Sequence, residues 1–402
     1  MTLEMTPMSM TRISRWTRLG LPVLVFLTGS LLVAFTGDAR ESGVPEVTDE
    51  AILRGRVLVT THACSGCHSG ILDPGVEGYL TGARSKAEEF VINGFTTRPA
   101  NLTPDPETGL GRYSDRQIFN ALRYGLKPKE APDTEITSGV PGQGNFPAKP
   151  KYLAPPMIWP AFRHLTDREL WDIVAYLKHG VKPVKHEVAP SENPDDFWVS
   201  YYADWNGAYP LPPFPTAQEV AAAAGDEQVL RGRLLVVNHG CGGCHKTGDD
   251  KIEAEGWLAG ARSPMDTFQI GPFITRARNL TPDNLTGLGR FTERQIFNSL
   301  RYGLRPGETP DVEITSTVPG QGNFPANPKY LAPPMPWPAW RHMTDQQLWD
   351  IAAYLKRGLK PVRNRVQDSD GPPDFWASGY TEELIGRYTA PPFPTANERA
   401  TP

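Results

Sequence analysis

Amphipathic segments preceded by helix-capping residues recur along the chain and predict helices. Ser114 and Gln117 form a capping-box pattern ahead of an apolar stripe, and Gly125 follows where a helix would end. Thr166 and Glu169 open another such segment, whose apolar residues would form one helical face: Leu170, Ile173, Val174 and Leu177. No stretch alternates between apolar and polar residues for long enough to predict a sheet.

The pattern occurs twice, because residues 47–216 align with residues 226–395 almost throughout. The shared blocks include TGLGR, QIFN, VPGQGNFPA and KYLAPPM, and the first capping pair recurs as Thr292 with Gln295. We call the two segments the first and the second repeat. Two repeats of this length are too few and too long for a solenoid or propeller, so the sequence predicts two globular domains in tandem.

The predicted fold class is all-α, with long loops rich in Pro and Gly. The chain has 41 Pro and 38 Gly among 402 residues, which favours short helices joined by long loops. A helix over about 49–59 is expected to open the first domain. The expected parts are a first domain at 47–182, a linker at 183–219 packed on that domain, a second domain at 226–360 and a C-terminal extension at 361–402.

The N-terminal residues 1–39 resemble an export signal. Three arginines, Arg12, Arg15 and Arg18, precede an apolar stretch of about 17 residues, Leu19 to Phe35. This length lies between the apolar core of a signal peptide and a minimal membrane-spanning helix. We therefore expect a cleaved signal peptide, or else an N-terminal anchor in the inner membrane, and a periplasmic location for the rest of the chain.

The charge of the chain argues against a nucleic-acid partner. The formal net charge is −4, and the Lys and Arg residues are spread along the sequence instead of being clustered. The chain therefore presents no obvious phosphate-binding face.

All four cysteines lie in two Cys-x-x-Cys-His motifs, and none is left for a disulfide framework. Two thiols at this spacing can form thioethers to the two vinyl groups of one porphyrin, and the adjacent His can then bind the iron. A zinc half-site or a redox dithiol also uses Cys-x-x-Cys. The following His, the recurrence and the export signal favour two covalently bound haem c groups, attached at Cys64, Cys67 and His68 and at Cys241, Cys244 and His245.

The second axial ligand of each iron is predicted from recurrence. Met157 and Met335 align with each other in a Pro-Pro-Met segment, and other methionines beyond the export segment have no aligned partner. Packing in the core is the alternative role for these side chains. Rival ligands that also recur are His62 with His239 and His164 with His342, whereas His179 and His186 do not recur and are expected at the surface.

The duplicated unit resembles a class I cytochrome c domain. More narrowly, NLTPDPETGLGRYSDRQIFNALRYG and PPMPWPAWRHMTDQQLWDIAAYLK are similar to segments of the cytochrome c subunits of membrane-bound alcohol and gluconate dehydrogenases. The resemblance implies that Met335 is the sixth ligand, and Met157 likewise, although Ile158 replaces the Pro of the motif. Those subunits usually carry three haem domains, whereas this chain has two motifs, which leaves the dehydrogenase partner open.

Further roles are expected for residues that recur in both repeats. The first and last helices of such a domain cross where a Gly meets an aromatic residue, and Gly55 with Tyr176 and Gly232 with Tyr354 occupy those places. Arg84 and Arg262 are candidates to neutralise haem propionates, with solvent exposure as the alternative. Trp159 and Trp337 would either shield the iron from water or pack in the core.

These residues predict an electron carrier more than an enzyme. With both axial positions filled on both irons, one-electron transfer remains as the function. The expected donor is a dehydrogenase or a quinol-oxidising complex, and the expected acceptor is a downstream cytochrome or oxidase. The alternative is a dihaem enzyme, of a peroxidase or sulfur-compound oxidoreductase type, in which one haem is open to substrate.

Overall fold

The computed structural model describes residues 43–92, 95–192, 211–245, 251–263, 266–270, 273–369, 385–386 and 389–400. The expected signal peptide or anchor at 1–39 lies outside these residues. Within the described ranges, no helix combines the length and the apolar character needed to cross a membrane.

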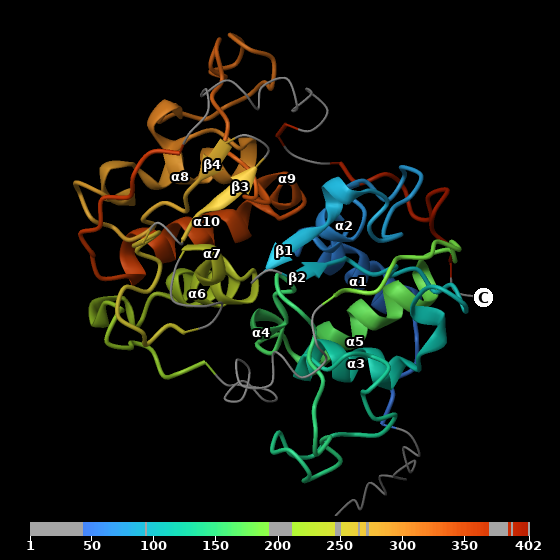
Figure 1. Ribbon diagram of the computed structural model, residues 1–402. Coiled ribbons are helices and arrows are strands. Elements are labelled where there is room, and N and C mark those ends of the chain that lie inside the picture. The colour runs from blue at the N-terminus through green and yellow to red at the C-terminus, as the bar shows by residue number, and fades with distance from the viewer. Residues whose placement is uncertain are drawn as a thin grey trace, which may run out of the picture. The chain divides into compact units, whose positions relative to one another are not determined.

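Helices dominate the structure, and they follow one another in the same order in the two repeats (Figure 1). In the first repeat they are α1 (Asp49–Thr61), α2 (Cys64–His68), α3 (Asp115–Tyr124), α4 (Trp159–Phe162) and α5 (Asp167–Ala175), continued by a π-helical turn, Tyr176–Gly180. In the second they are α6 (Glu227–Asn238), α7 (Cys241–His245), α8 (Glu293–Tyr302), α9 (Trp337–Trp340) and α10 (Asp345–Ala353), continued by Tyr354–Gly358. Short 3-10 turns lie at Lys86–Glu88, Leu110–Arg112, Ala221–Ala223, Leu288–Arg290 and Pro306–Glu308.

The predicted capping boxes are present at the helix starts. The Ser114 hydroxyl accepts from the Gln117 amide while the Gln117 side chain accepts from the Ser114 amide, and Gly125 ends α3 with a φ of 68°. Thr166 and Glu169 make the same reciprocal pair at α5. The mostly helical structure is compatible with the all-α prediction.

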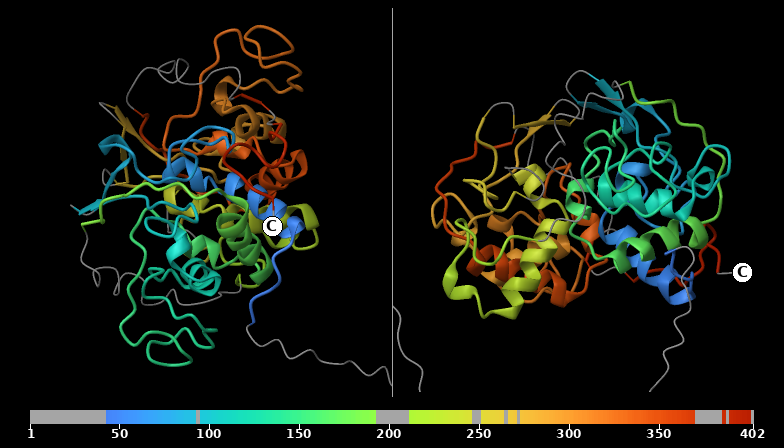
Figure 2. Two further views of the ribbon diagram at one scale, coloured as in Figure 1. Left: turned by 90° about the vertical axis from the view of Figure 1, so that its right-hand side faces the viewer. Right: turned by 90° about the horizontal axis from the view of Figure 1, so that it is seen from below.

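Two short β-hairpins were not predicted from the sequence. Strand β1 (Phe90–Ile92) pairs antiparallel with β2 (Phe95–Thr97), and β3 (Phe268–Ile270) pairs with β4 (Phe273–Thr275). The elements of the first repeat, blue to green, and of the second, yellow to red, form two groups that each carry one hairpin (Figure 2). Three-residue strands are too short to give a recognisable alternation, so the pattern could not reveal them.

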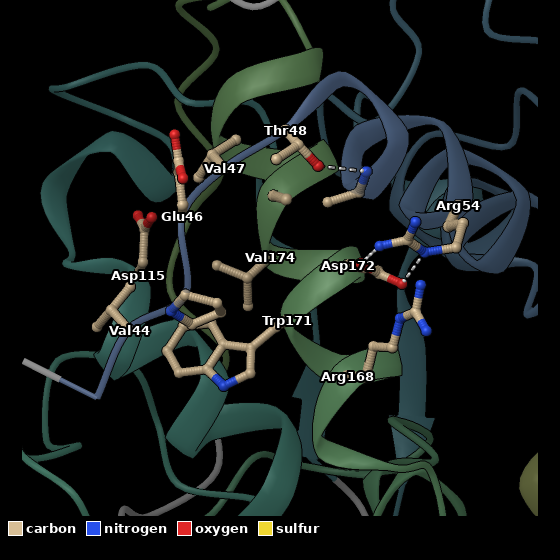
Figure 3. A pocket seen from close by; sticks show the side chains of 13 residues that line it. Val44, Glu46, Val47, Thr48, Arg54, Asp115, Arg168, Trp171, Asp172 and Val174 are labelled. Carbon is tan, nitrogen blue, oxygen red and sulfur yellow. Dashed lines mark hydrogen bonds and ion pairs between the residues drawn. The ribbon is translucent and has the colours of Figure 1, made fainter. Parts of the chain in front are cut away.

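The first and last helices of each repeat cross at a glycine, as the resemblance implied. A Cβ atom on Gly55 would lie 1.8 Å from the Asp172 carbonyl oxygen and 2.8 Å from the Tyr176 Cβ. Beside this crossing, the Arg54 guanidinium donates to both Asp172 carboxylate oxygens, at 2.7 and 2.8 Å (Figure 3). Only glycine permits the approach, because any other side chain would overlap the backbone of α5.

The second repeat contains the same crossing between α6 and α10. A Cβ on Gly232 would lie 1.8 Å from the Asp350 carbonyl oxygen, and Arg231 donates to the Asp350 carboxylate at 2.9 and 3.2 Å. Apolar side chains of the crossing helices are fully buried in both repeats: Ile52, Val59 and Leu170 in the first, and Val229, Val236 and Leu348 in the second.

The linker differs from its prediction, because its two described ends contact different repeats. Its beginning, 183–192, contacts the first repeat, where Asn101 donates to the Val184 carbonyl at 2.9 Å. Residues 211–219, which we call the linker end, instead contact the second repeat, where Arg233 donates to Glu219 at 2.7 Å. The expectation of a linker packed wholly on the first domain was therefore wrong for the linker end.

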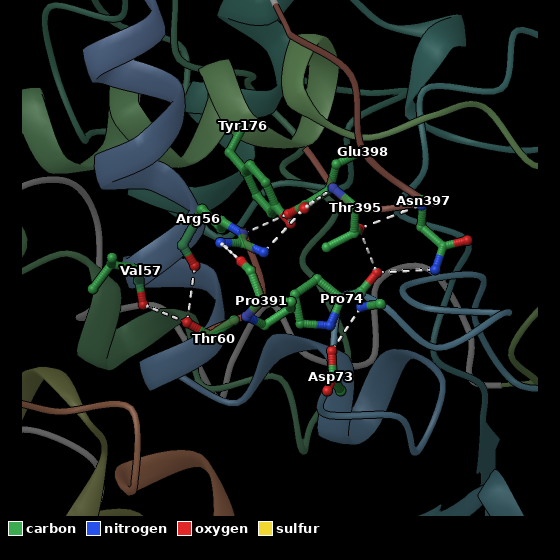
Figure 4. A network of polar contacts seen from close by, with 11 residues as sticks. Arg56, Val57, Thr60, Asp73, Pro74, Tyr176, Pro391, Thr395, Asn397 and Glu398 are labelled. Carbon is green, nitrogen blue, oxygen red and sulfur yellow. Dashed lines mark hydrogen bonds and ion pairs between the residues drawn. The ribbon is translucent and has the colours of Figure 1, made fainter. Parts of the chain in front are cut away.

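The C-terminal extension makes the reverse crossing. Residues 389–399, which we call the tail, contact the first repeat, where Arg56 donates to Glu398 at 2.7 Å and Tyr176 donates to the same carboxylate at 2.5 Å (Figure 4). Each repeat thus ends in a segment that packs beside the first helix of the other repeat.

Candidate functional site

The two Cys-x-x-Cys-His motifs form single helical turns, α2 and α7, directly after the first helix of each repeat. Ala63 and Gly240 connect the helices through left-handed turns, with φ values of 56° and 65°. In each motif the first cysteine, Cys64 or Cys241, is half-buried against an apolar cluster, and the second is exposed. None of the four cysteines forms a disulfide, which is compatible with thioether attachment.

The histidine of each motif is oriented by a backbone carbonyl. His68 Nδ1 lies 2.7 Å from the Ala100 carbonyl oxygen, and His245 Nδ1 lies 2.7 Å from the Arg278 carbonyl oxygen. Since a carbonyl only accepts, Nδ1 carries the hydrogen and Nε2 has the lone pair. Burial lowers the pKa of both rings, which favours the neutral form that binds metals.

The environment of Cys64 argues against a redox dithiol. Burial, and secondarily the neighbouring Cys67, raises the pKa of the Cys64 thiol to about 12. Redox-active Cys-x-x-Cys pairs need a lowered thiol pKa, because the thiolate is the reacting species. The motif therefore presents a protonated thiol beside a neutral imidazole, which fits covalent haem attachment better.

Met157 and Met335 occupy equivalent places at the ends of their loops. Each amide donates to the carbonyl three residues earlier, Ala154 at 3.2 Å and Ala332 at 3.3 Å, and a short helix begins two residues later. Both side chains are half-buried and pack against the apolar cluster of their own repeat. Their ligation of iron remains a prediction. The structure adds that the two methionines occupy equivalent, half-buried positions in their repeats.

Trp159 and Trp337 pack in the core beside these methionines. Both side chains are fully buried, and they stack on Tyr152 and Tyr330 with ring centroids 5.9 Å apart. A Cβ on Gly125 would lie 2.2 Å from the Trp159 ring. The indole thus fills the space beside a glycine with positive φ. Of the two predicted roles, packing in the core and shielding of the iron from water, this contact supports packing in the core.

The candidate propionate ligands make contacts within their own loops. Arg84 forms an ion pair of 3.1 Å with Glu88 and donates to the Ser69 carbonyl, and its side chain is partly exposed. The Arg262 amide donates to Asp266 at 2.9 Å. Both arginines lie in the loop after the motif, and their role towards propionates remains a prediction.

The rival histidines lie in different surroundings. His164 and His342 precede the helices α5 and α10, and burial lowers the pKa of His342 to about 3. His179 contacts Asp115 at 2.9 Å and His186 contacts the Ala83 carbonyl at 2.9 Å, so both are partly buried instead of lying free at the surface.

His62 and His239 meet each other across the two repeats, which the sequence did not reveal. Their ring centroids are 4.2 Å apart and their planes are inclined by 14°. Recurrence alone pointed to a shared role within each repeat. Contact between the two copies of one position can be seen only in three dimensions.

The donor set in each repeat fits a haem c group. A Cys pair, a neutral His whose lone pair is on Nε2 and a half-buried Met recur at equivalent positions, and these are the attachment and axial groups of a cytochrome c. The residues that would hold the two groups are Cys64, Cys67, His68 and Met157, and Cys241, Cys244, His245 and Met335.

Curated relatives include cytochrome c subunits of dehydrogenases. The chain is 26% identical over 357 residues to the cytochrome c subunit of alcohol dehydrogenase (quinone) from Gluconacetobacter polyoxogenes, covering 86% of this chain and 64% of that protein. It is 26% identical over 360 residues to the gluconate 2-dehydrogenase cytochrome c subunit of Pantoea cypripedii, covering 87% and 67%. A dihaem cytochrome of c type from Cereibacter sphaeroides is 24% identical over 233 residues, covering 56% and 67%.

The alignments cover most of this chain but not all of its relatives. The chain spans slightly less than two thirds of the length of the alcohol dehydrogenase subunit. No protein-family model matches the chain. The resemblance inferred from the motifs is nevertheless confirmed, because over most of its length this chain is similar to the cytochrome c subunits of alcohol and gluconate dehydrogenases.

Proposed function

We propose that the chain is a periplasmic cytochrome that carries two covalently attached haem c groups and transfers single electrons. The observation that carries the proposal is the paired imidazole geometry: His68 and His245, each directly after a Cys pair, are held by a carbonyl at the same distance of 2.7 Å. A hydrogen bond of this kind fixes the ring and increases its basicity as a ligand.

The residues of each repeat have separate roles in this proposal. Cys64 with Cys67, and Cys241 with Cys244, anchor the porphyrins as thioethers. His68 with Met157, and His245 with Met335, would supply the iron ligands of the two haems. A haem with both axial positions filled supplies one-electron chemistry and has no position for substrate, and His/Met ligation gives a comparatively high potential.

The similar proteins suggest the kind of partner. They are named as cytochrome c subunits of dehydrogenases, so we infer that the donor is a dehydrogenase or a quinol-oxidising complex. A downstream cytochrome or oxidase would accept the electrons. The apolar segment after Arg18 would direct export of the chain to the periplasm. It would then either be cleaved as a signal peptide or stay in the inner membrane as an anchor.

Intact mass spectrometry of the exported protein tests the proposal. The wild type should carry two covalent haem additions, and Cys64→Ser with Cys67→Ser should remove one of them. The matched variant, Cys241→Ser with Cys244→Ser, should remove the other. A protein with one addition or none would overturn the dihaem proposal, and two additions with a high-spin iron in the resting protein would favour the dihaem enzyme.

A further inference from the structure

An aromatic stack between the two repeats joins the segments that carry the Cys-x-x-Cys-His motifs. His62 ends α1 and His239 ends α6, and each lies two residues before the first cysteine of its motif. Their rings stack at 4.2 Å, and the edge of His62 also meets the Phe162 ring at 5.7 Å. The stack therefore brings the two motif-bearing turns close together.

Each ring contacts a carbonyl of its own helix through Nδ1, and His239 Nδ1 also lies 2.6 Å from Asn238 Oδ1. His62 Nδ1 lies 2.9 Å from the Leu58 carbonyl oxygen, and His239 Nδ1 lies 2.9 Å from the Leu235 carbonyl oxygen. Each bond holds its ring against the last turn of its own helix. Because both rings are oriented within their own repeat, their contact helps to set how one repeat meets the other.

The same contact places each motif against the methionine segment of the other repeat. A Cβ on Gly240, between His239 and its motif, would lie 3.3 Å from Ile158 Cδ1, and Ile158 follows Met157. In the opposite direction, Ala63 packs against the apolar cluster of the second repeat, and α1 contacts α9 just after Met335. The interface thus joins the proposed haem-binding segments of both repeats.

A metal ion is a poor occupant for the histidine pair. The Nε2 atoms of both rings are buried and have no hydrogen-bond partner in the part of the chain that the structure describes. However, a ring nitrogen directs its lone pair within the plane of the ring, and the two planes are nearly parallel. The two lone pairs therefore do not converge on an ion between the rings.

We propose that His62 and His239 are positioning residues that hold the two haem-bearing segments in contact, so that electrons pass between the two haems within one chain. The inference rests on the proposed function, since it requires both haems. One electron leaves the ferrous iron of one repeat and reduces the ferric iron of the other, and no bond forms or breaks. The chain then accepts at one repeat and delivers at the other.

The test uses the full-length holoprotein with His62→Ala and His239→Ala. Pulsed electron resonance on the oxidised protein measures the distribution of iron-to-iron distances, and flash reduction measures how fast an electron equilibrates between the haems. The wild type should give one narrow distribution. Either substitution should lose the narrow distribution and slow the equilibration, while haem content stays at two per chain.

Two further variants separate positioning from stability. The pair His62→Phe with His239→Phe should restore the stack and the narrow distribution. His179→Ala removes a ring that contacts Asp115 within the first repeat, and it should leave both measurements unchanged. Where an alanine variant does not fold, His62→Gln replaces it, since the amide can still donate to the Leu58 carbonyl but cannot stack.

The results distinguish failure of this inference from failure of the proposed function. A wild type without two covalent haems would overturn the proposed function itself. Alanine or glutamine variants that hold two haems and keep the wild-type distance distribution and rate would overturn the positioning role alone.

Discussion

The linker end and the tail make the same buried contact, but they reach it by different routes along the chain. Glu219 accepts from Arg233, only 14 residues away, whereas Glu398 accepts from Arg56, which is 342 residues away. In both cases the carboxylate is fully buried, and a tyrosine, Tyr354 or Tyr176, donates to it. The first of these clusters is thus local, whereas the second connects the tail to the first helix of the first repeat.

The tail has additional anchors that the linker end does not show among the described residues. The Asn397 side chain donates to the Pro74 and Val76 carbonyls at 2.9 and 2.8 Å, and Arg399 donates to the His179 and Lys178 carbonyls. Closing a longer loop costs more chain entropy, so a distant segment needs more contacts to stay bound. The same sequence, at 212–216 and 391–395, thus belongs to a local attachment in the linker end and to a long-range attachment in the tail.

The largest expected effect comes from Glu398→Ala. The substitution leaves the buried Arg56 guanidinium without its carboxylate, which costs about 3–5 kcal/mol of unfolding free energy. We expect the tail to detach and to become sensitive to limited proteolysis, measured alongside denaturant unfolding. Glu219→Ala should cost a similar amount without exposing the tail, and a Glu398→Ala protein with wild-type stability would contradict the comparison.

Gly55→Ala tests the helix crossing that both repeats share. The added methyl would overlap the Asp172 carbonyl, so we expect a loss of about 1–3 kcal/mol or more of unfolding free energy. Gly232→Ala should behave alike, because the distance to Asp350 is the same. Gly225→Ala is the control, since a Cβ there meets nothing within 4 Å. Unequal losses at the two crossings would show that the repeats are not equivalent in packing.

The histidine stack predicts a pH dependence that belongs to both repeats. Burial lowers the pKa of His62 and of His239, and the hydrogen bonds to the Leu58 and Leu235 carbonyls oppose this only in part. The unfolded chain therefore binds more protons, and unfolding free energy should decrease as pH falls below about 6.5. Denaturant unfolding at several pH values measures the slope, and His62→Phe with His239→Phe should make it shallower. If the slope of the double variant equals that of the wild type, the pH dependence comes from other titratable groups.

The smallest expected effect comes from Asn397→Ala. The change removes two hydrogen bonds to exposed or partly buried carbonyls, which water can satisfy in the variant, so we expect a total loss of at most about 1 kcal/mol of unfolding free energy. Gln218→Ala, at the equivalent place in the linker end, should have less effect. Hydrogen exchange of the amides in each mutated segment compares the two variants. Equal effects would show that the Asn397 side chain gives the tail no additional anchoring.

Local features of the fold could be predicted from the sequence, because neighbouring residues determine them. The capping boxes at Ser114 and Thr166 and the glycine crossing at Gly55 are present as expected. Cap residues act within one turn of chain and so leave a readable signal. The glycine crossing joins residues that are far apart in the chain, and it was expected from the resemblance to class I cytochrome c domains.

Long-range features could not be predicted in the same way. Glu219 and Glu398 each lie three residues after the same PPFPT segment, but the sequence could not show that they pack beside different repeats. The contact between His62 and His239 likewise depends on how the repeats meet. Within the proposed haem sites, the sequence identified the donor residues, and the structure added the carbonyl partners at Ala100 and Arg278 that orient the imidazoles.

The most direct test of the central claim is the absorption spectrum of the purified protein, oxidised and reduced, with Met157→Ala and Met335→Ala measured beside the wild type. The proposal predicts a fully low-spin wild type whose methionine-to-iron charge-transfer band is reduced by half in each variant. If one haem is high-spin in the wild type, or if neither substitution alters the spectrum, then His/Met ligation at both haems is contradicted.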